Sequence, residues 1–208
     1  MIYKTDDRNP DKEIIKACAE VIKNGGIAIF PTETVYGIGV NAFDESAVRR
    51  LYALKNRPAD KPLLMHIHGR EAAEKLGYLG CRARRLIELY TPGPLTLVVK
   101  KRPCVPPCAV SCGETVGLRF PSNGIFIALA KAAGVPVAAT SANFSGFESA
   151  KNASELKTLA GLADFVIDGG ECEYSFESTI LSLVGSPRIL RQGAFPREKI
   201  EEVVGKCD

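Results

Sequence analysis

The residues best suited to chemistry are three cations within seven positions, in the segment Lys55-Asn56-Arg57-Pro58-Ala59-Asp60-Lys61-Pro62. Proline fixes its own φ and restricts the residue before it, so Pro58 and Pro62 hold the cations in place. Arginine offers a planar fork that matches phosphate, and lysine offers a compact point charge. The spacing therefore predicts a rigid clamp for a polyphosphate. The alternative is a solvated basic loop that joins a helix to a strand.

Other polar clusters are expected at strand ends or turns, where α/β proteins place ligands. Residues 31–37 bring hydroxyls, a carboxylate and a phenol together at one strand exit. Residues 140–146 form a run of small donors that can bind an anion. The segments 177–179 and 191–193 form a further pair near the end of the chain. The alternatives are turn capping for 31–37 and a helix cap or polar loop for 140–146.

Two side chains in apolar surroundings are further candidates. Arg119 is a charge in the otherwise apolar segment 117–121, and a buried arginine must be paired or meet a ligand. His66 lies between Met65 and Ile67, a setting more typical of a structural histidine. No P-loop, Rossmann turn or Ser/His/Asp motif is present. Spacing alone therefore predicts an α/β domain with an anion-binding site, most simply an enzyme.

Composition narrows the class of protein. The chain has 208 residues, which fits one large domain over 1–208. Its net charge of +3 is too small to favour nucleic-acid binding through bulk electrostatics. The first residues are polar where a signal peptide would be apolar, and no apolar run approaches the ~18 residues of a membrane span. We therefore expect a cytoplasmic protein.

Seven cysteines make an odd count, which argues against a secreted disulfide framework. Cys104, Cys108 and Cys112 are evenly spaced and raise the alternative of a metal or redox site. Zinc sites favour Cys-x-x-Cys pairs and a fourth ligand, and the prolines at 106–107 prevent a helix that would align the three thiols. We expect free thiols and no metal site.

Helical and extended patterns alternate along the chain, which is typical of an α/β or α+β fold. Residues 102–114 are rich in proline and cysteine and are expected to be irregular. Helices are expected at 11–24, 44–54, 70–76, 81–90, 124–133, 153–159 and 196–204, and strands at 27–30, 63–67, 95–100, 115–120, 135–140, 164–167, 177–184 and 188–191.

Taken together and in order, these motifs resemble the YrdC/TsaC family, the L-threonylcarbamoyladenylate synthases. Seven motifs carry the resemblance, each weak alone but specific as an ordered set that covers nearly the whole chain. They are Pro-Thr-Glu-Thr-Val-Tyr-Gly at 31–37, Lys-Asn-Arg-Pro-Ala-Asp-Lys-Pro-Leu at 55–63, Thr-Pro-Gly-Pro-Leu-Thr at 91–96, Val-Gly-Leu-Arg-Phe-Pro at 116–121, Thr-Ser-Ala-Asn-Phe-Ser-Gly at 140–146, Glu-Ser-Thr-Ile at 177–180 and Leu-Arg-Gln-Gly at 190–193.

The resemblance implies a fold and a reaction. It implies the short form of the family, a single α/β domain with a twisted mixed sheet, flanking helices and a deep basic cavity. The implied reaction condenses L-threonine, bicarbonate and ATP, with Mg²⁺, into threonylcarbamoyl-AMP and pyrophosphate. The product then serves the threonylcarbamoylation of adenosine 37 in tRNA by a downstream transferase complex.

The resemblance also implies site residues. Thr34, His66, Arg119 and Ser178, with backbone near Ala139, would surround threonine. Arg57, Lys61, Thr115, Ser141 and Arg191 would contact ATP, and Lys55, Arg57 and Lys61 would be catalytic, with Lys55 close to the phosphates. The cysteine-rich loop at 102–112 departs from the family pattern.

Two other functions remain alternatives at this stage. One is a protein that binds double-stranded RNA or tRNA in the same basic cavity, and the other is a carbamoyl-transfer module that relies on a partner. RNA binders spread basic and aromatic residues over a broad face. Here the cations cluster in one short turn and aromatic residues make up only 7% of the chain, which favours a small polyanion.

Overall fold

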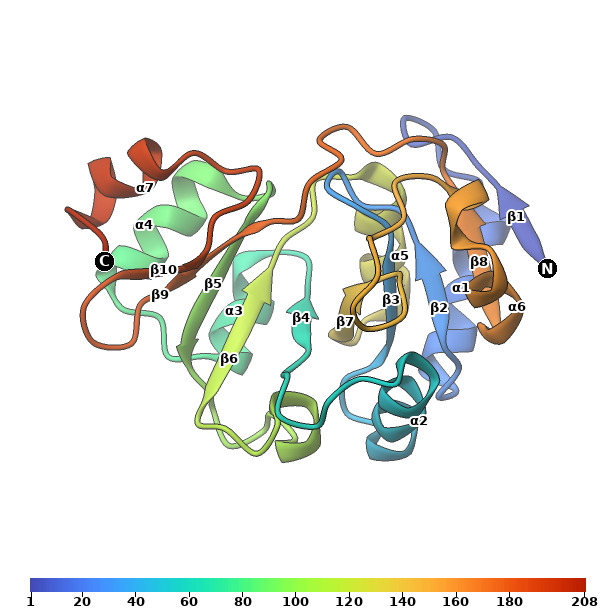
Figure 1. Ribbon diagram of the computed structural model, residues 1–208, viewed down its shortest axis with the longest axis horizontal. Helices are drawn as coiled ribbons and strands as arrows, with labels where there is room; N and C mark the ends of the chain where they lie inside the picture. Colours follow the sequence, from blue (N-terminus) through green and yellow to red (C-terminus); the bar gives the residue numbers. More distant parts are fainter.

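A computed structural model describes all 208 residues. Ten strands form one mixed sheet in the order β1-β8-β2-β3-β7-β4-β6-β5-β9-β10, so β4 lies near its centre (Figure 1). The strands are β1 Ile2–Lys4, β2 Ala28–Phe30, β3 Gly37–Asn41, β4 Leu64–His66, β5 Leu95–Lys100, β6 Thr115–Arg119, β7 Val137–Ser141, β8 Phe165–Asp168, β9 Thr179–Ser182 and β10 Arg188–Arg191. The expected fold class, α/β with a mixed sheet, is confirmed.

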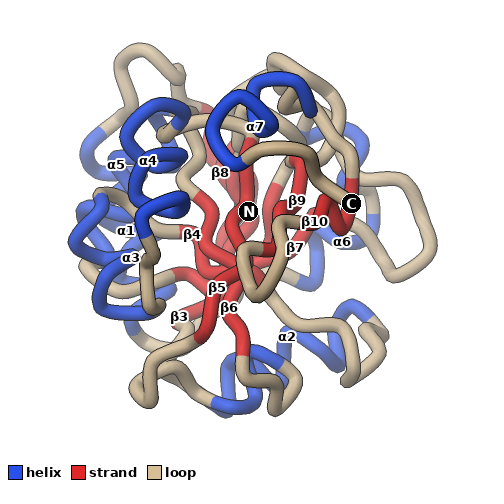
Figure 2. The backbone as a smooth tube through the Cα atoms, turned by 90° about the vertical axis from the view of Figure 1, so that its left-hand side faces the viewer, coloured by secondary structure: helices blue, strands red, loops and turns tan.

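Helices lie on both sides of this sheet. Figure 2 shows α1, α3, α4 and α5 gathered on one side, and α2 and α6 on the other. The helices are α1 Lys12–Lys23, α2 Glu45–Lys55, α3 Arg70–Leu76, α4 Cys81–Tyr90, α5 Gly124–Ala133, α6 Thr158–Leu162 and α7 Arg197–Val204, with 3₁₀ turns η1 Pro107–Val110 and η2 Ala153–Leu156. None of these helices has the length and apolar character needed to cross a membrane.

Helix α1 shows how the sequence specifies an element. The Asp11 carboxylate accepts hydrogen bonds from the backbone N–H groups of Glu13 and Ile14, which caps the first turn. Its buried face includes Ile15 and Ile22, spaced at the helical period, and packs against α5 in one apolar cluster. This packing holds α1 and α5 against one face of the sheet.

The register of the central strands places the polar side chains. Strand β6 pairs in parallel with β4, so that Arg119 lies opposite His66. On its other side β6 pairs with β5, and Thr96 lies opposite Arg119. Strand β5 in turn pairs with β9, where Leu95 lies opposite Thr179. Side chains from segments far apart in the chain therefore meet on neighbouring strands.

The expected element bounds are largely confirmed, with three differences. Strand β1 was not expected, and it pairs in parallel with β8. Strand β3 was not expected either, because its glycines at 37 and 39 hide the strand pattern. They are required by close packing, since a Cβ on Gly39 would lie about 2.6 Å from the Val137 side chain. The helix expected at 153–159 is instead η2 followed by α6, because Lys157 between them has φ 47°.

Candidate active site

A cavity of about 510 Å³ opens where strands β4, β6, β7 and β9 meet the loops at 31–37 and 57–62. It combines this volume with convergent polar groups, which is the usual form of a small-molecule site. The structure brings to it every expected site residue except Lys55, namely Thr34, Arg57, Lys61, His66, Thr115, Arg119, Ala139, Ser141, Ser178 and Arg191.

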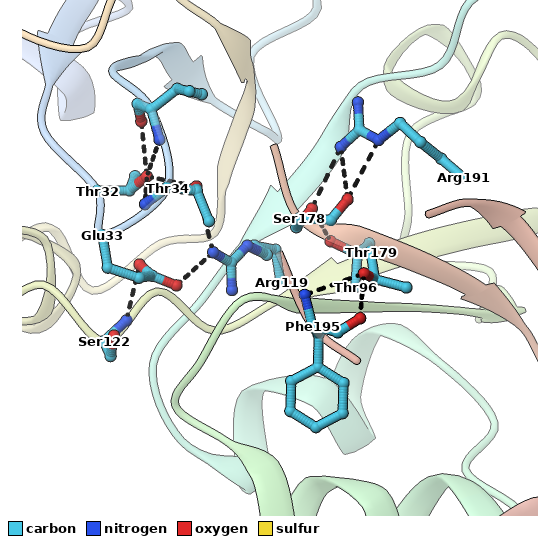
Figure 3. Close-up of polar contacts among 11 residues, drawn as sticks. Thr32, Glu33, Thr34, Thr96, Arg119, Ser122, Ser178, Thr179, Arg191 and Phe195 are labelled. Carbon is cyan, nitrogen blue, oxygen red and sulfur yellow. Dashed lines mark hydrogen bonds and ion pairs between the residues drawn. The ribbon is translucent and has the colours of Figure 1, made fainter. Parts of the chain in front are cut away.

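Arg119 lies in one wall of the cavity and is 1% exposed. Its Nη2 forms an ion pair with Glu33 Oε1 and donates to Thr34 Oγ1 at 3.4 Å (Figure 3). Its Nη1 is buried and has no hydrogen-bond partner. Buried donors without a partner are rare in folded proteins, so one donor nitrogen of this guanidinium is left unused by the protein's own groups.

Glu33, which the sequence interpretation did not select, lies behind this wall as the partner of Arg119. It is 3% exposed, and its second carboxylate oxygen accepts from the backbone N–H of Ser122 at 3.1 Å (Figure 3). Its own carbonyl accepts from the N–H of Tyr174 at 2.9 Å. The expectation that a buried Arg119 must be paired or meet a ligand contained the signal for this residue, since a carboxylate lies in the motif at 31–37.

His66 supplies an uncharged surface beside Arg119. Burial, and secondarily the Arg119 charge, lowers the pKa of the His66 imidazole to about 3, so the ring is neutral at physiological pH. The rings of Phe30 and Phe126 pack edge-on against it, at centroid distances of 6.3 and 5.7 Å. The imidazole is thus both a packed core group, as its flanking residues indicated, and part of the cavity wall.

Ser178 joins the two halves of the cavity wall. Its hydroxyl lies 2.9 Å from Thr96 Oγ1, within hydrogen-bond distance. Its carbonyl accepts from Nε and Nη2 of Arg191 at 3.1 and 2.9 Å, which holds that guanidinium along the cavity rim (Figure 3). Gly193 allows this approach, because a Cβ there would lie about 2.2 Å from the Glu177 carbonyl oxygen.

The basic turn is held by its own arginine. Arg57 donates from Nε to the Lys61 carbonyl at 3.0 Å, from Nη2 to the Pro62 carbonyl at 2.9 Å and from Nη1 to Thr140 Oγ1 at 3.3 Å. Lys61 itself is exposed and forms no ion pair. Arg57 therefore shapes the turn as well as lining the cavity, while the Lys61 ammonium is free to move onto an anion.

The structure corrects the expectation that Lys55 lies on the same turn as Arg57 and Lys61. It is the last residue of α2, it is 1% exposed and it lies behind the cavity wall rather than on the turn. Its Nζ donates to the Ser141 carbonyl and, at 3.0 Å, to Asn143 Oδ1. Burial, then the charge of Arg57, lowers the pKa of Lys55 to about 7. The three cations thus do not share one turn, because the helix continues through the first of them.

Asn143 is a second residue that the sequence interpretation did not select. Its Oδ1 also accepts from Ser141 Oγ at 2.7 Å, and its Nδ2 donates to the Phe147 carbonyl at 2.6 Å. The side chain therefore ties Lys55 and Ser141 to the loop that follows β7. The run of small donors at 140–146 was expected to bind an anion, and part of its capacity is used in these internal contacts.

The cysteine-rich loop lies apart from the cavity lining. Cys104 and Cys112 are exposed, and Cys108 lies half-buried in η1. The Cys104 thiol donates to the Lys75 carbonyl at 3.0 Å. No group of three His, Cys, Asp or Glu side chains in the structure is arranged to hold a metal ion.

The profile of the Sua5/YciO/YrdC family, described as "Telomere recombination", matches residues 20–193. The chain belongs to the Sua5/YciO/YrdC family. It is 41% identical over 195 residues to the threonylcarbamoyl-AMP synthase of Pyrococcus abyssi, covering 92% of this chain and 57% of that relative. It is 37% identical over 201 residues to the putative threonylcarbamoyl-AMP synthase of Methanocaldococcus jannaschii, covering 96% and 94%.

A solved structure in this family extends the likeness to the whole fold. The crystal structure of P. abyssi Sua5 complexed with L-threonine matches with a TM-score of 0.96 at 38% identity, covering all of this chain and 62% of that one. The chain thus spans less than two thirds of the P. abyssi relative's length. The family and the fold inferred from the seven ordered motifs are both confirmed.

Proposed function

We propose that the protein is an L-threonylcarbamoyladenylate synthase, a nucleotidyltransferase that uses L-threonine, bicarbonate and ATP. The relatives named threonylcarbamoyl-AMP synthase and the L-threonine complex of P. abyssi Sua5 support this assignment. The single observation that carries it is the cavity itself, which a buried Arg119 with an unpaired donor lines together with Arg57, Lys61 and Arg191. We also propose that residues 1–208 act as one domain in this reaction.

The chemistry requires no nucleophile from the protein. The threonine ammonium loses a proton, and the amine adds to bicarbonate to give a carbamate with loss of water. A carbamate oxygen attacks the α-phosphorus of ATP, the bond to the β-phosphate bridging oxygen breaks, and pyrophosphate leaves. Such a reaction is accelerated mainly by positioning the reactants and stabilising charge. The cavity supplies cations and hydroxyls for both tasks.

We assign the two ends of the cavity to the two large substrates. Arg119, Thr34, His66, Ser178 and the backbone at Ala139 bind threonine, with the carboxylate on the guanidinium. The ATP phosphates lie on Arg57, Lys61 and Arg191, and the nucleotide extends toward Thr115 and Ser141. Lys55 acts from behind Ser141, where its hydrogen bonds fix the wall against which the phosphates lie.

Mg²⁺ fits this arrangement as a companion of ATP. Magnesium keeps several waters and is commonly held by one or two carboxylates together with substrate phosphates. Asp60 and Glu177 are the carboxylates that line the cavity with the basic residues, and they are the side chains that would hold the ion. When bound, it would neutralise phosphate charge.

The product is a mixed anhydride that must pass to an acceptor. We propose that the acceptor step is the threonylcarbamoylation of adenosine 37 in tRNA by a separate transferase complex. Direct tRNA or double-stranded RNA binding is the weaker alternative, because the cations converge on one cavity of about 510 Å³ rather than on an extended face.

A pyrophosphate-release assay on the purified protein tests the proposal. We expect release from ATP only when threonine and bicarbonate are both present, with threonylcarbamoyl-AMP identified by mass. Release that is independent of threonine, or no release beside RNA binding, would contradict it.

A further inference from the structure

Five cations lie in or directly behind the cavity wall, and they differ in one respect. Only Arg119 has a carboxylate partner, since no ion pair includes Lys55, Arg57, Lys61 or Arg191. The partner, Glu33, does not line the cavity. Arg119 and Glu33 therefore form a nearly neutral pair, whereas the other four cations form no ion pair, although the carboxylates of Asp60 and Glu177 line the cavity with them.

The Glu33 carboxylate is fully committed to this pairing. One oxygen faces Arg119 Nη2 and the other accepts from Ser122 N–H. Both side chains of the pair are at most 3% exposed, so water screens their charges little. A buried guanidinium without such a partner would be a strong site for any small anion, because Coulomb interactions grow as the local dielectric falls.

We propose that Glu33 is the countercharge and positioning residue that makes the amino-acid end select a zwitterion. This inference rests on the proposed function. Threonine carries no net charge, so it matches a neutral pair whose arginine still has the free donor Nη1. An anion of the same shape without the ammonium group finds no net positive charge on this pair. Arg57, Lys61 and Arg191, which form no ion pair, in contrast suit a polyphosphate.

The test uses 3-hydroxybutyrate, the analogue of threonine that lacks the amine and carries one negative charge. Its affinity for the apoprotein is measured by calorimetry, and its competition with threonine is measured at saturating ATP. For the wild type we expect it to bind at least about 10²-fold more weakly than threonine. For Glu33→Gln we expect its affinity to rise at least about tenfold while that of threonine falls, because Arg119 loses its countercharge.

A gain in affinity separates this role from a structural one, since damage to the pocket would weaken both ligands. Glu33→Asp keeps the charge and should keep the preference for threonine. Glu171→Gln removes an exposed carboxylate from a neighbouring loop and should change neither affinity.

The outcomes that would overturn the inference are distinct. Equal binding of the two ligands by the wild type would overturn it even if Glu33→Gln failed to fold. Unchanged or weaker 3-hydroxybutyrate binding by a folded Glu33→Gln would also overturn it, with the proposed function intact. A wild type that binds no threonine would contradict the proposed function, and this inference with it.

Discussion

The two ends of the cavity use the same residue type in opposite ways. At the amino-acid end, Arg119 is buried and paired with Glu33. At the proposed phosphate site, Arg57 forms no ion pair and instead donates to two carbonyls of its own turn and to Thr140. Arg119 is thus buried and paired with a carboxylate, whereas Arg57 forms no ion pair and holds its own turn in place. The buried ion pair with Glu33 distinguishes Arg119 from the other cations of the cavity.

This difference bears on how the two substrates are recognised. A zwitterion needs fixed donors and little net charge, whereas a polyanion needs net positive charge that can adapt to it. The rigid end lies on paired strands of the sheet, where Arg119 is opposite His66 and Thr96. The adaptable end lies on a loop, where the Lys61 side chain is exposed. In the proposed assignment, each substrate thus lies on the kind of backbone that suits it.

The largest expected effect concerns selection at the amino-acid end. Valine replaces the threonine hydroxyl with a methyl group and leaves its buried partners without a hydrogen bond. We expect kcat/KM for valine to be on the order of 10⁴-fold below that for threonine. Serine lacks only one methyl group, so its loss should be roughly 10–200-fold. Turnover with the three amino acids measures this, and equal rates for valine and threonine would refute a threonine-specific pocket.

The second effect concerns the phosphate end. Lys61→Ala and Arg57→Ala should each lower kcat/KM by on the order of 10²-fold or more, through lost stabilisation of transition-state charge. They should differ in stability, because Lys61 is exposed while Arg57 holds the turn together. Thermal unfolding should therefore leave Lys61→Ala like the wild type and lower the Tm of Arg57→Ala by a few degrees. Near-normal turnover in both variants would show that Arg57 and Lys61 do not act on the phosphates.

The lowered pKa of Lys55, which lies behind the cavity wall, predicts that the free energy of unfolding depends on pH. Its pKa is lowered from 10.5 to about 7 in the folded protein, so between these values the unfolded chain holds a proton that the folded chain lacks. This group therefore makes the folded state more stable as pH rises from about 7 toward 10. Lys55→Met lacks the titration, so its stability relative to the wild type should be highest at pH 7 and below.

Urea unfolding of both proteins at pH 6.5 and pH 9 tests this effect. We expect the wild type to gain on the variant at the higher pH. Parallel changes in the two proteins would show that Lys55 keeps an ordinary pKa in the folded state.

The smallest effect is expected in the cysteine-rich loop, which lies outside the cavity lining. A triple Cys→Ser variant at Cys104, Cys108 and Cys112 should keep wild-type turnover within about twofold, because substitutions at surface positions away from a site cost little. Elemental analysis of the wild type should find no stoichiometric zinc or iron. One equivalent of metal that disappears in the variant, together with stability, would make this loop a metal site.

Much of the fold could be predicted from sequence pattern, and the exceptions have physical causes. Helices α3, α4 and α5 and strand β5 have the expected bounds because their apolar period and end signals agree. Strand β3 could not be recognised, since Gly37 and Gly39 are present for close packing and carry no strand propensity. The break at Lys157 depends on a positive φ that its residue type does not favour.

Some residues of the site could likewise be predicted from the sequence, and others could not. Residues that contact the cavity from ordered motifs, such as Arg119 and Ser178, could be predicted because those motifs are contiguous in the chain. The pairing of Glu33 with Arg119 joins segments 86 residues apart, and no local pattern specifies it. The burial of Lys55 likewise depends on helix α2 continuing one residue further than expected, which places its amine against Ser141 and Asn143.

In the mechanism that we propose, one cavity binds a zwitterion beside the paired Arg119 and a polyphosphate beside the unpaired cations, and joins them through a carbamate. The most direct measurement supplies ¹³C-bicarbonate, threonine and ATP to the purified protein and follows the labelled carbon by mass spectrometry and NMR. We expect one labelled carbonyl in a product that also contains threonine and AMP, formed in equal amount to pyrophosphate. Pyrophosphate without labelled product, or labelled carbamate that never joins AMP, would contradict it.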